Sequence, residues 1–538
     1  MAGLAASFGS GAMTNSISEI SKASCIFVIG SNTTEGHPVI ALEIKKAIKN
    51  GAKLIVANPR EIELCHYAHV WLRHSPGADV ALLMGMMKVI LDEKLADLAF
   101  IEERCENFDA FKQSLNNFDL DFTEEITGVA RDNIIEAARL YATHKPATLL
   151  YAMGITQHSH GTDNVLATAN LAMLTGNIGK PSTGVNPLRG QNNVQGACDM
   201  GALPNVYTAY QKVDNPDIQK KFETAWNCSL HTKPGLTLTE MLNASYDGQI
   251  KAIYLMGENP IISDPDATHV EEALNNLEFL IVQDMFLTET AQLADVVLPA
   301  TSFAEKDGTF VNTERRVQRV RKAIEPIGNS KPDWVILCQI ASRMGAKDFD
   351  FDSPSQIMDE IANLTPSYGG INYQRLETCG LQWPCPTPDH PGTPILHIGI
   401  FSRGKGNFAP LEYKPPKEQP DKDYPLILTT GRGPFHFHTG TMTRKVNGLN
   451  EIEPEAVVEI NPADADSLKI TDGDKVKVIS RRGKITTKVK VTEESPPKVV
   501  YMSFHFAESS ANVLTNPALD PISKIPEFKV CAVRIEKD

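Results

Sequence analysis

The sequence lacks three features that would place it in common classes of protein. None of its 9 cysteines belongs to a C-x-x-C pair, so we expect buried thiols and no iron–sulfur cluster held by this chain. No run approaches the ~20 apolar residues of a membrane span, and the first residues lack the basic start of a signal peptide. An excess of basic residues is also absent: 66 acidic residues outnumber 52 basic ones, and the net charge of −14 argues against a nucleic-acid partner. These absences favour a cytoplasmic protein.

The remaining composition is that of an ordinary globular protein, with 42% hydrophobic and 22% charged residues. A chain of 538 residues exceeds what one hydrophobic core supports, because domains usually hold about 100–200 residues. We therefore expect about three or four domains.

A β–α–β pattern begins near the N-terminus. An apolar strand over 24–29 ends at Gly30, a helical pattern covers 40–49, and a second apolar strand over 53–57 ends at Asn58. A strand that ends in glycine lets backbone amides and a helix N-terminus approach a phosphate. The pattern alone is also typical of doubly wound sheets that bind no nucleotide.

The same order returns in the middle of the chain. A strand over 252–256 ends at Gly257, a helix is centred on 270–276, and a strand over 279–282 leads to Gln283 and Asp284. The distance from the glycine to the polar residue at the tip of the next strand differs by one position between the two segments. This repeat predicts two related, doubly wound α/β domains that hold a ligand with two nucleotide ends.

The C-terminal part has a different pattern. After a Pro-rich stretch, 384–420, short β segments alternate with turns, for example over 457–460, 475–479 and 484–489. This pattern predicts a β-barrel domain that follows a linker. The domain boundaries that we expect are 1–191 for the first α/β domain, 192–303 for the second, 304–420 for connecting segments and linker, and 421–538 for the barrel.

The most specific segment lies between the two repeats. Residues 176–201 form a Gly-, Asn- and Gln-rich loop around Arg189 that is too polar for a core, and its amides could line an anionic pocket. The run RGQNNVQ at 189–195 resembles the signature loop of molybdenum or tungsten formate dehydrogenases. These enzymes belong to the larger family of bis-molybdopterin-guanine-dinucleotide (bis-MGD) oxidoreductases.

Other segments resemble motifs of this family in the family's order. They are YAMGITQ at 151–157, EKDGTFVNTERR at 305–316, the stretch 429–442, and the tail that carries Phe504, Asn512 and Lys529. The resemblance implies an enzyme that oxidises formate to carbon dioxide, or catalyses the reverse, at a bis-MGD centre with Mo or W. It also implies that each α/β domain holds one guanosine and that a barrel of the double-psi type closes over both.

The resemblance implies a role for individual residues. The first nucleotide would be held by Gly30, Ser31, Asn32, Glu35, Asn58, Pro59, Arg60 and Asp79. The second would be held by Gly257, Asn259, Gln283, Asp284, Lys306 and Asp333. Met153, Gly154, Gln157 and Gln191 would contact the cofactor near the pterin, and the barrel would add Thr430, Arg432, His436, His438, Thr439, Phe504, Asn512 and Lys529. Arg189 matches the family's substrate arginine, whose planar fork can pair with both oxygens of formate; a phosphate or structural contact is the alternative.

One group that the family requires has no counterpart in this chain. Relatives carry a cysteine or selenocysteine ligand of the metal, followed by histidine, shortly before the stretch that resembles residues 2–7, and a [4Fe-4S] domain further upstream. We therefore assign no metal ligand, and we expect a chain that starts just after that ligand and lacks the N-terminal half of the second α/β domain. A selenocysteine codon read as a stop would explain the start; a split subunit and a gene fragment are alternatives.

The expected partners are formate or carbon dioxide and an iron–sulfur or other electron-transfer subunit, with no nucleic acid and no membrane span. Two other functions remain open. One is a nitrate or other oxyanion reductase of the same family, against which the run at 189–195 favours formate. The other is a truncated module that binds the cofactor or a partner without activity alone.

Overall fold

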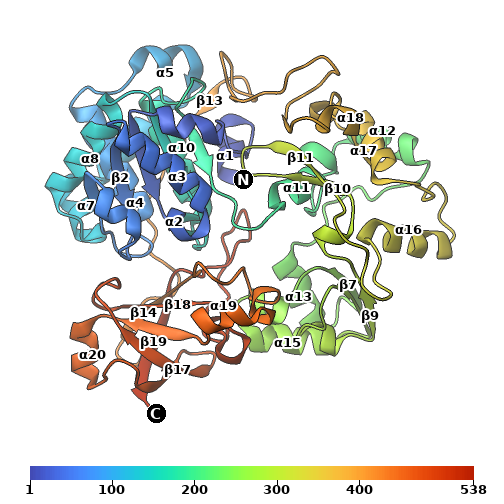
Figure 1. Ribbon diagram of the computed structural model, residues 1–538. Helices are drawn as coiled ribbons and strands as arrows, with labels where there is room; N and C mark the ends of the chain where they lie inside the picture. The colour runs from blue at the N-terminus through green and yellow to red at the C-terminus, as the bar shows by residue number, and fades with distance from the viewer. The chain divides into compact units, whose positions relative to one another are not determined.

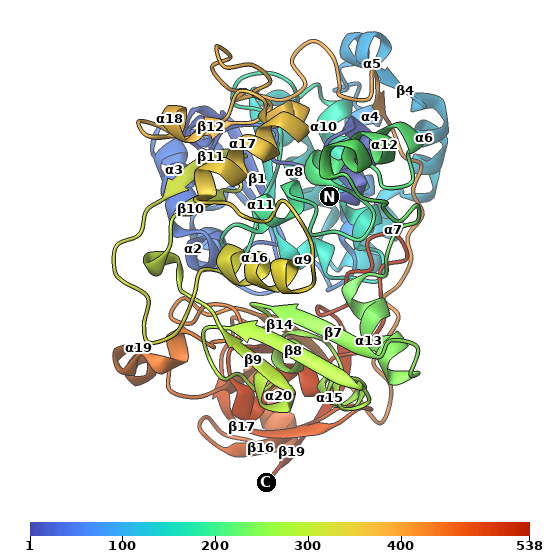
Figure 2. The same ribbon diagram turned by 90° about the vertical axis from the view of Figure 1, so that its right-hand side faces the viewer.

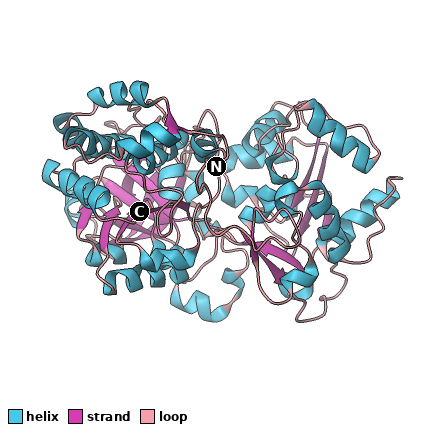
Figure 3. Cartoon of the chain, turned by 90° about the horizontal axis from the view of Figure 1, so that it is seen from above, coloured by secondary structure: helices cyan, strands magenta, loops and turns pink.

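The computed structural model describes residues 1–538, which form two compact units (Figure 1). Unit 1 comprises residues 1–190, 262–268 and 395–538, and unit 2 comprises 191–261 and 269–394. Both units contain helices and strands (Figure 3). No helix is long and apolar enough to cross a membrane.

The N-terminal part of unit 1 is a parallel sheet of five strands in the order β3-β2-β1-β5-β6. The strands are β1 (Cys25–Ile29), β2 (Lys53–Ala57), β3 (Val70–Leu72), β5 (Ala147–Tyr151) and β6 (Val185–Pro187). The helices around it are α1 (Ala2–Phe8), α2 (Thr33–Gly36), α3 (Pro38–Lys49), α4 (Asp79–Asp92), α5 (Leu98–Arg104), α6 (Phe108–Ser114), α7 (Leu120–Thr127), α8 (Arg131–Thr143), α9 (Met153–Thr156) and α10 (Gly161–Leu174). This sheet confirms the predicted β–α–β unit.

Strand β1 is apolar along its whole length because both faces of the sheet are covered. Phe27 and Ile29 pack into a core with helices α4, α8 and α10. Ile26 and Val28 point to the opposite face and pack against Ile44 of α3. Since side chains alternate along a strand, this burial on both faces requires the uninterrupted apolar run seen in the sequence.

Unit 2 contains the second β–α–β segment, a parallel sheet in the order β7-β8-β9 (Figure 2). Its elements are β7 (Ala252–Met256), β8 (Phe279–Asp284), β9 (Val296–Pro299) and α13 (Leu238–Tyr246), with α14 (Pro260–Ser263) and α15 (Ala267–Asn275), of which residues 262–268 belong to unit 1. Leu255 and Val282 face a core with residues of α13 and α15. Tyr254, Met256 and Phe279 are exposed, at 39%, 51% and 42%. The repeat is confirmed, and its second copy is covered by helices on one face of the sheet.

The rest of unit 2 is a small antiparallel sheet with short helices. Its elements are β10 (Gly308–Val311), β11 (Arg316–Val320), β12 (Leu381–Gln382), α11 (Val194–Asp199), α12 (Pro216–Trp226), α16 (Asp333–Arg343), α17 (Pro354–Leu364) and α18 (Tyr373–Leu376). Asp199 is buried and joins several of these segments. Its carboxylate accepts hydrogen bonds from Gln195, Tyr210, Tyr368 and Trp383 at 2.6–2.8 Å.

The C-terminal part of unit 1 is a closed barrel in the order β14-β18-β15-β17-β16-β19. Its elements are β14 (Leu426–Gly431), β15 (Val457–Ile460), β16 (Lys475–Ile479), β17 (Lys484–Val491), β18 (Val499–Ser503), β19 (Cys531–Lys537), α19 (Asn447–Ile452) and α20 (Pro462–Leu468). Alternate residues, such as Val476 and Val478 of β16, fill the interior. Closure pairs every strand on both sides, which removes exposed edges. The predicted fold class is thus confirmed.

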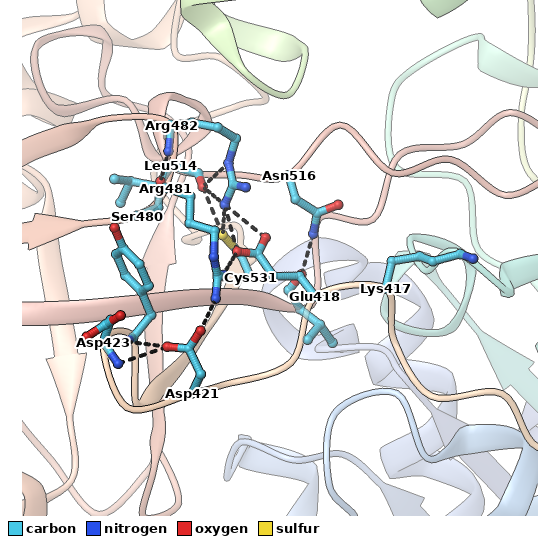
Figure 4. Close-up of polar contacts among 12 residues, drawn as sticks. Lys417, Glu418, Asp421, Asp423, Ser480, Arg481, Arg482, Leu514, Asn516 and Cys531 are labelled. Atoms are coloured by element: carbon cyan, nitrogen blue, oxygen red, sulfur yellow. Dashed lines mark hydrogen bonds and ion pairs between the residues drawn. The ribbon is translucent and has the colours of Figure 1, made fainter.

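The Pro-rich stretch before the barrel is bonded to both parts of unit 1. Its strand β13 (Gly406–Asn407) pairs with β4 (Cys105–Glu106) of the α/β domain. Further along, Glu418 forms ion pairs with Arg481 and Arg482 of the barrel, the latter at 2.9 Å (Figure 4). Only 10% of the Glu418 side chain is exposed, so its charge depends on these two guanidinium groups.

We expect Glu418→Gln to lower the free energy of unfolding by about 2 kcal/mol, because the change leaves two guanidinium groups without their shared carboxylate. Urea denaturation at pH 7 measures this loss. Glu412→Gln, in the same segment but exposed, is the matched control and should change stability by less than about 0.5 kcal/mol. Equal effects of the two substitutions would contradict a fastening role for Glu418.

Candidate functional site

A cavity of about 160 Å³ lies within unit 1 between the α/β domain and the barrel. It lies at the carboxyl ends of strands β1, β2 and β5, the usual ligand site of an open parallel sheet. The predicted site residues that line it are Gly30, Ser31, Asn32, Glu35, Asn58, Pro59, Arg60, Asp79, Met153, Gly154, Gln157, Thr430, Arg432, Phe504 and Lys529. The structure therefore brings together residues that span almost the whole chain.

Two glycines touch at one wall of this cavity. Gly30 follows β1 with a φ of +58°, and its carbonyl accepts a hydrogen bond from the amide of Gly154 at 2.9 Å. A Cβ on Gly154 would lie 2.5 Å from the Cα of Gly30. The two strand ends approach this closely because neither residue has a side chain, which leaves backbone groups at the cavity wall.

The cavity's positive charge comes from Arg432 and Lys529, neither of which has a carboxylate partner. Burial and, to a lesser extent, the charge of Arg432 lower the pKa of Lys529 to about 7. Burial also lowers the pKa of Arg432, whose guanidinium packs against Gly190. The Nζ atom of Lys529 donates to the carbonyl of Thr430. An anionic ligand would relieve the repulsion between these cations, so this end of the cavity suits a phosphate group.

Arg60 lines the same cavity, but its charge is compensated by the barrel. Its Nε and Nη2 atoms donate to both oxygens of Glu459 at 2.7 and 2.9 Å, and Nη2 also pairs with Glu494. The guanidinium lies 4.4 Å from the centre of the Tyr501 ring. Arg60 therefore fastens the α/β domain to the barrel, in addition to any contact that it makes with a ligand. Burial raises the pKa of the neighbouring Glu35.

Arg189, the predicted substrate residue, follows strand β6 and is half-buried. Its Nη2 atom donates to the carbonyl of Gly11 at 3.0 Å. The next residue, Gly190, lines the cavity of unit 1. Gln191 is the first residue of unit 2 and does not line this cavity.

Several predicted barrel residues lie outside the cavity lining because they bond to neighbouring segments. His436 donates through Nε2 to the carbonyl of Glu453 at 2.8 Å. The carbonyl of His438 accepts from His505, and Thr439 bonds to Thr441 at 2.9 Å. Asn512 donates to the carbonyl of Ile262 at 2.7 Å.

Unit 2 has a second cavity, of about 310 Å³, whose lining includes Lys306, Asp333 and Asn193. Lys306 forms an ion pair with Asp333, which also accepts from Gln283 at 2.7 Å. Asp284 follows Gln283 at the end of β8. This cavity suits a ligand that hydrogen-bonds to a carboxylate and an amide.

The strand ends show the same kind of hydrogen bond within each unit. The amide of Gly257 donates to the carbonyl of Gln283 at 2.9 Å, as the amide of Gly30 does to Ala57 at 3.0 Å. Asn259, two residues after Gly257, is buried and bonds to Glu289 and Thr290. The predicted repeat thus extends to the hydrogen bonds at the strand ends.

Sequence reasoning missed several residues that line the cavity of unit 1, notably His37, His74, His158 and Tyr501. His74 and His158 stand in no repeated pattern. His158 does follow directly after the motif at 151–157, with a second histidine two positions on. That pair of histidines was the one feature of the sequence that could have pointed to His158.

Comparison with known proteins connects this geometry to a family. The model of the family described as molybdopterin oxidoreductase matches residues 4–343, and that of the molydopterin dinucleotide binding domain matches 426–532. The F420-dependent formate dehydrogenase subunit alpha of Methanocaldococcus jannaschii is 54% identical over 99% of this chain and 80% of its own length. Formate dehydrogenase H of Escherichia coli K12 is 40% identical over 100% of this chain and 76% of its own length.

A solved structure shows the same fold. Acetylene hydratase from Pelobacter acetylenicus superposes with a TM-score of 0.79 at 22% sequence identity, and the match covers 100% of this chain and 80% of that one. At this identity the likeness concerns the arrangement of the elements.

Buried histidines predict a loss of stability in acid. Burial lowers the pKa of His37, His158, His438 and His505 to about 4 in each case. The unfolded chain binds these protons near pH 6.5, so stability is fully present above that pH and is lost as the pH falls toward 4. We expect the free energy of unfolding to drop by at least about 3 kcal/mol between pH 7 and pH 4.5, measured by urea denaturation.

His438→Gln should make this pH dependence shallower, whereas His66→Gln should not, because the side chain of His66 is 66% exposed. An unchanged slope in the His438 variant would show that this residue is not held neutral by burial.

Proposed function

The chain belongs to the molybdopterin oxidoreductase family, and we propose that it is the cofactor-binding part of a formate dehydrogenase catalytic subunit. The observation that carries the proposal is the pair Arg432 and Lys529, whose charges no carboxylate neutralises, in a cavity beside the strand-end glycines Gly30 and Gly154. This arrangement fits the diphosphate of a dinucleotide. The identity of 54% to a formate dehydrogenase subunit over 99% of the chain supports formate as the substrate.

The residues present fit a bis-MGD cofactor with one nucleotide in each unit. In unit 1, Arg432 and Lys529 would hold the diphosphate, and residues after β1 and β2 would line the nucleoside. In unit 2, Asp333 and Lys306 line a cavity, and Gln283 donates to Asp333 and holds it in place; the carboxylate and ammonium groups would face the edge of a guanine. When bound, the cofactor would supply a Mo or W centre with the chemistry to take up two electrons, for delivery to an electron-transfer partner.

The chain's own part in the reaction is to bind and orient formate. Oxidation of formate breaks its C–H bond and yields carbon dioxide, one proton and two electrons. The guanidinium of Arg189 can hold both carboxylate oxygens in one plane, which fixes the direction of the C–H bond. The carbonyl of Gly11 accepts a hydrogen bond from one Nη atom and so limits rotation of the guanidinium group.

We expect Arg189→Lys to lower kcat/KM for formate by about 100-fold, because lysine keeps the charge but loses the two-pronged geometry. The measurement is formate-dependent dye reduction by protein purified with its cofactor, alongside its molybdenum or tungsten content, which should not change. Arg139→Lys is the matched control, since Arg139 is an exposed residue paired with Glu93. A parallel loss of metal and activity in the Arg189 variant would mean that Arg189 holds the cofactor or the fold.

The same assay separates the other functions. Nitrate reduction by reduced dye, without formate oxidation, would assign the chain to an oxyanion reductase of this family. Protein that contains the cofactor but turns over neither substrate would be a binding module.

Lys529 provides a test of the diphosphate site that needs no turnover. We expect guanosine diphosphate to bind more weakly at pH 8.5 than at pH 6.5, because the pKa of Lys529 is about 7 and its charge is lost as the pH rises. Lys529→Met should weaken binding at pH 6.5 by about tenfold and flatten the pH dependence. Isothermal titration calorimetry measures both.

Lys414→Met, an exposed residue paired with Asp163, should leave the affinity unchanged. Equal affinities of the wild type and the Lys529 variant at both pH values would place the phosphates elsewhere.

A further inference from the structure

Four buried titratable side chains, His74, Asp79, His158 and His160, gather beside the cavity of unit 1. Their exposed fractions are 3%, 2%, 1% and 3%. His74, Asp79 and His158 line the cavity, and His160 stacks on His158 with ring centres 5.4 Å apart. The binding and orientation of formate described above use none of the three histidines.

His74 is bonded through both of its ring nitrogens. Its Nδ1 atom faces the carbonyl of Leu72 at 3.3 Å, and its Nε2 atom faces Oδ1 of Asp79 at 3.1 Å. Burial works to raise the pKa of Asp79, but the contact with His74 lowers it. His74 and Asp79 thus form a buried hydrogen-bonded pair.

His158 is hydrogen-bonded through only one of its ring nitrogens. Its Nε2 atom donates to the carbonyl of Gly154 at 2.8 Å and lies 3.7 Å from Oδ2 of Asp79. Its Nδ1 atom has no hydrogen-bond partner in the protein. The ring is therefore neutral with its proton on Nε2, and burial keeps its pKa at about 4. The carboxylate of Asp79 favours this tautomer because it attracts the Nε2 proton.

The acceptor of this hydrogen bond belongs to the turn that forms one wall of the cavity. Gly154 lies in helix α9, and its amide is already bonded to Gly30 at 2.9 Å. Met153 and Gln157, at the two ends of the turn, line the cavity. The amide of Gly154 thus bonds Gly30 and its carbonyl bonds His158, so both backbone polar groups of this residue are held.

We propose that His158 is a positioning residue that fixes the turn of residues 153–157, and that Asp79, paired with His74, acts through His158. The importance of this turn for cofactor binding rests on the proposed function, whereas the hydrogen bond to Gly154 does not. His158→Gln keeps a donor on a side chain of similar reach, and His158→Leu removes it. His160→Leu is the matched control, because His160 is equally buried, lacks a protein partner for its ring nitrogens and does not line the cavity.

The first measurement is amide hydrogen exchange of the segment 153–157 in the full chain. We expect His158→Leu to raise the exchange rate at least about tenfold over the wild type, and His158→Gln and His160→Leu to raise it less than about threefold. Equal exchange in the two leucine variants would overturn the proposal, because loss of burial alone would then explain the effect. If His158→Leu does not fold, a rate in His158→Gln as high as that of the isolated, unprotected segment would overturn it as well.

The second measurement is the affinity for guanosine diphosphate by calorimetry at pH 6.5. We expect His158→Leu to weaken binding about tenfold while His158→Gln and His160→Leu stay within about threefold of the wild type. If the wild type binds no guanosine diphosphate, the proposed nucleotide site fails, and the exchange experiment still decides the role of His158. Normal binding by His158→Leu despite faster exchange would overturn the link between the turn and the ligand.

Discussion

Buried carboxylates of the barrel hold it against the first α/β domain, and the cavity of unit 1 depends on these bonds. Glu459 pairs with Arg60, to which the more exposed Glu494 adds a second contact; Glu527 accepts from the amide and hydroxyl of Ser159, and Asp520 does the same for Thr162. Each charge requires its partners, since an unpaired carboxylate in a buried interface costs several kcal/mol. These hydrogen bonds, and not apolar contacts alone, therefore fix how the two halves of the cavity wall are aligned.

Charge is distributed unevenly along this cavity. Around Arg60 the cation is balanced by glutamates, whereas Arg432 and Lys529 have no acidic partner. A ligand with a neutral base and an anionic linker would thus be oriented by charge before any base contact is made.

Much of the fold could be predicted from the sequence because its signals are local. Strand β1 must be apolar at every position to be buried on both faces, and Gly30 must lack a side chain to meet Gly154. The family motifs placed most of the residues in the cavity wall. The role of Arg60 as a fastener could not be predicted, because Glu459 lies 399 positions away and no local pattern links the two. His74 and His158 were missed although their hydrogen bonds to Leu72, Asp79 and Gly154 are local, because a histidine outside any repeated pattern gives no signal in the sequence.

The order of the chain has a consequence for synthesis. Unit 1 combines residues 1–190 with residues 395–538, so its α/β domain leaves the ribosome long before the barrel that completes it. Lys529 and strand β19 (Cys531–Lys537), which closes the barrel, follow every other element of unit 1 in the chain. Arg60 and Ser159 have no carboxylates to bond until the barrel has been made, and the wall beside Gly30 stays open until then. The wall of this cavity is therefore completed only after translation has passed β19, long after the α/β domain has been made.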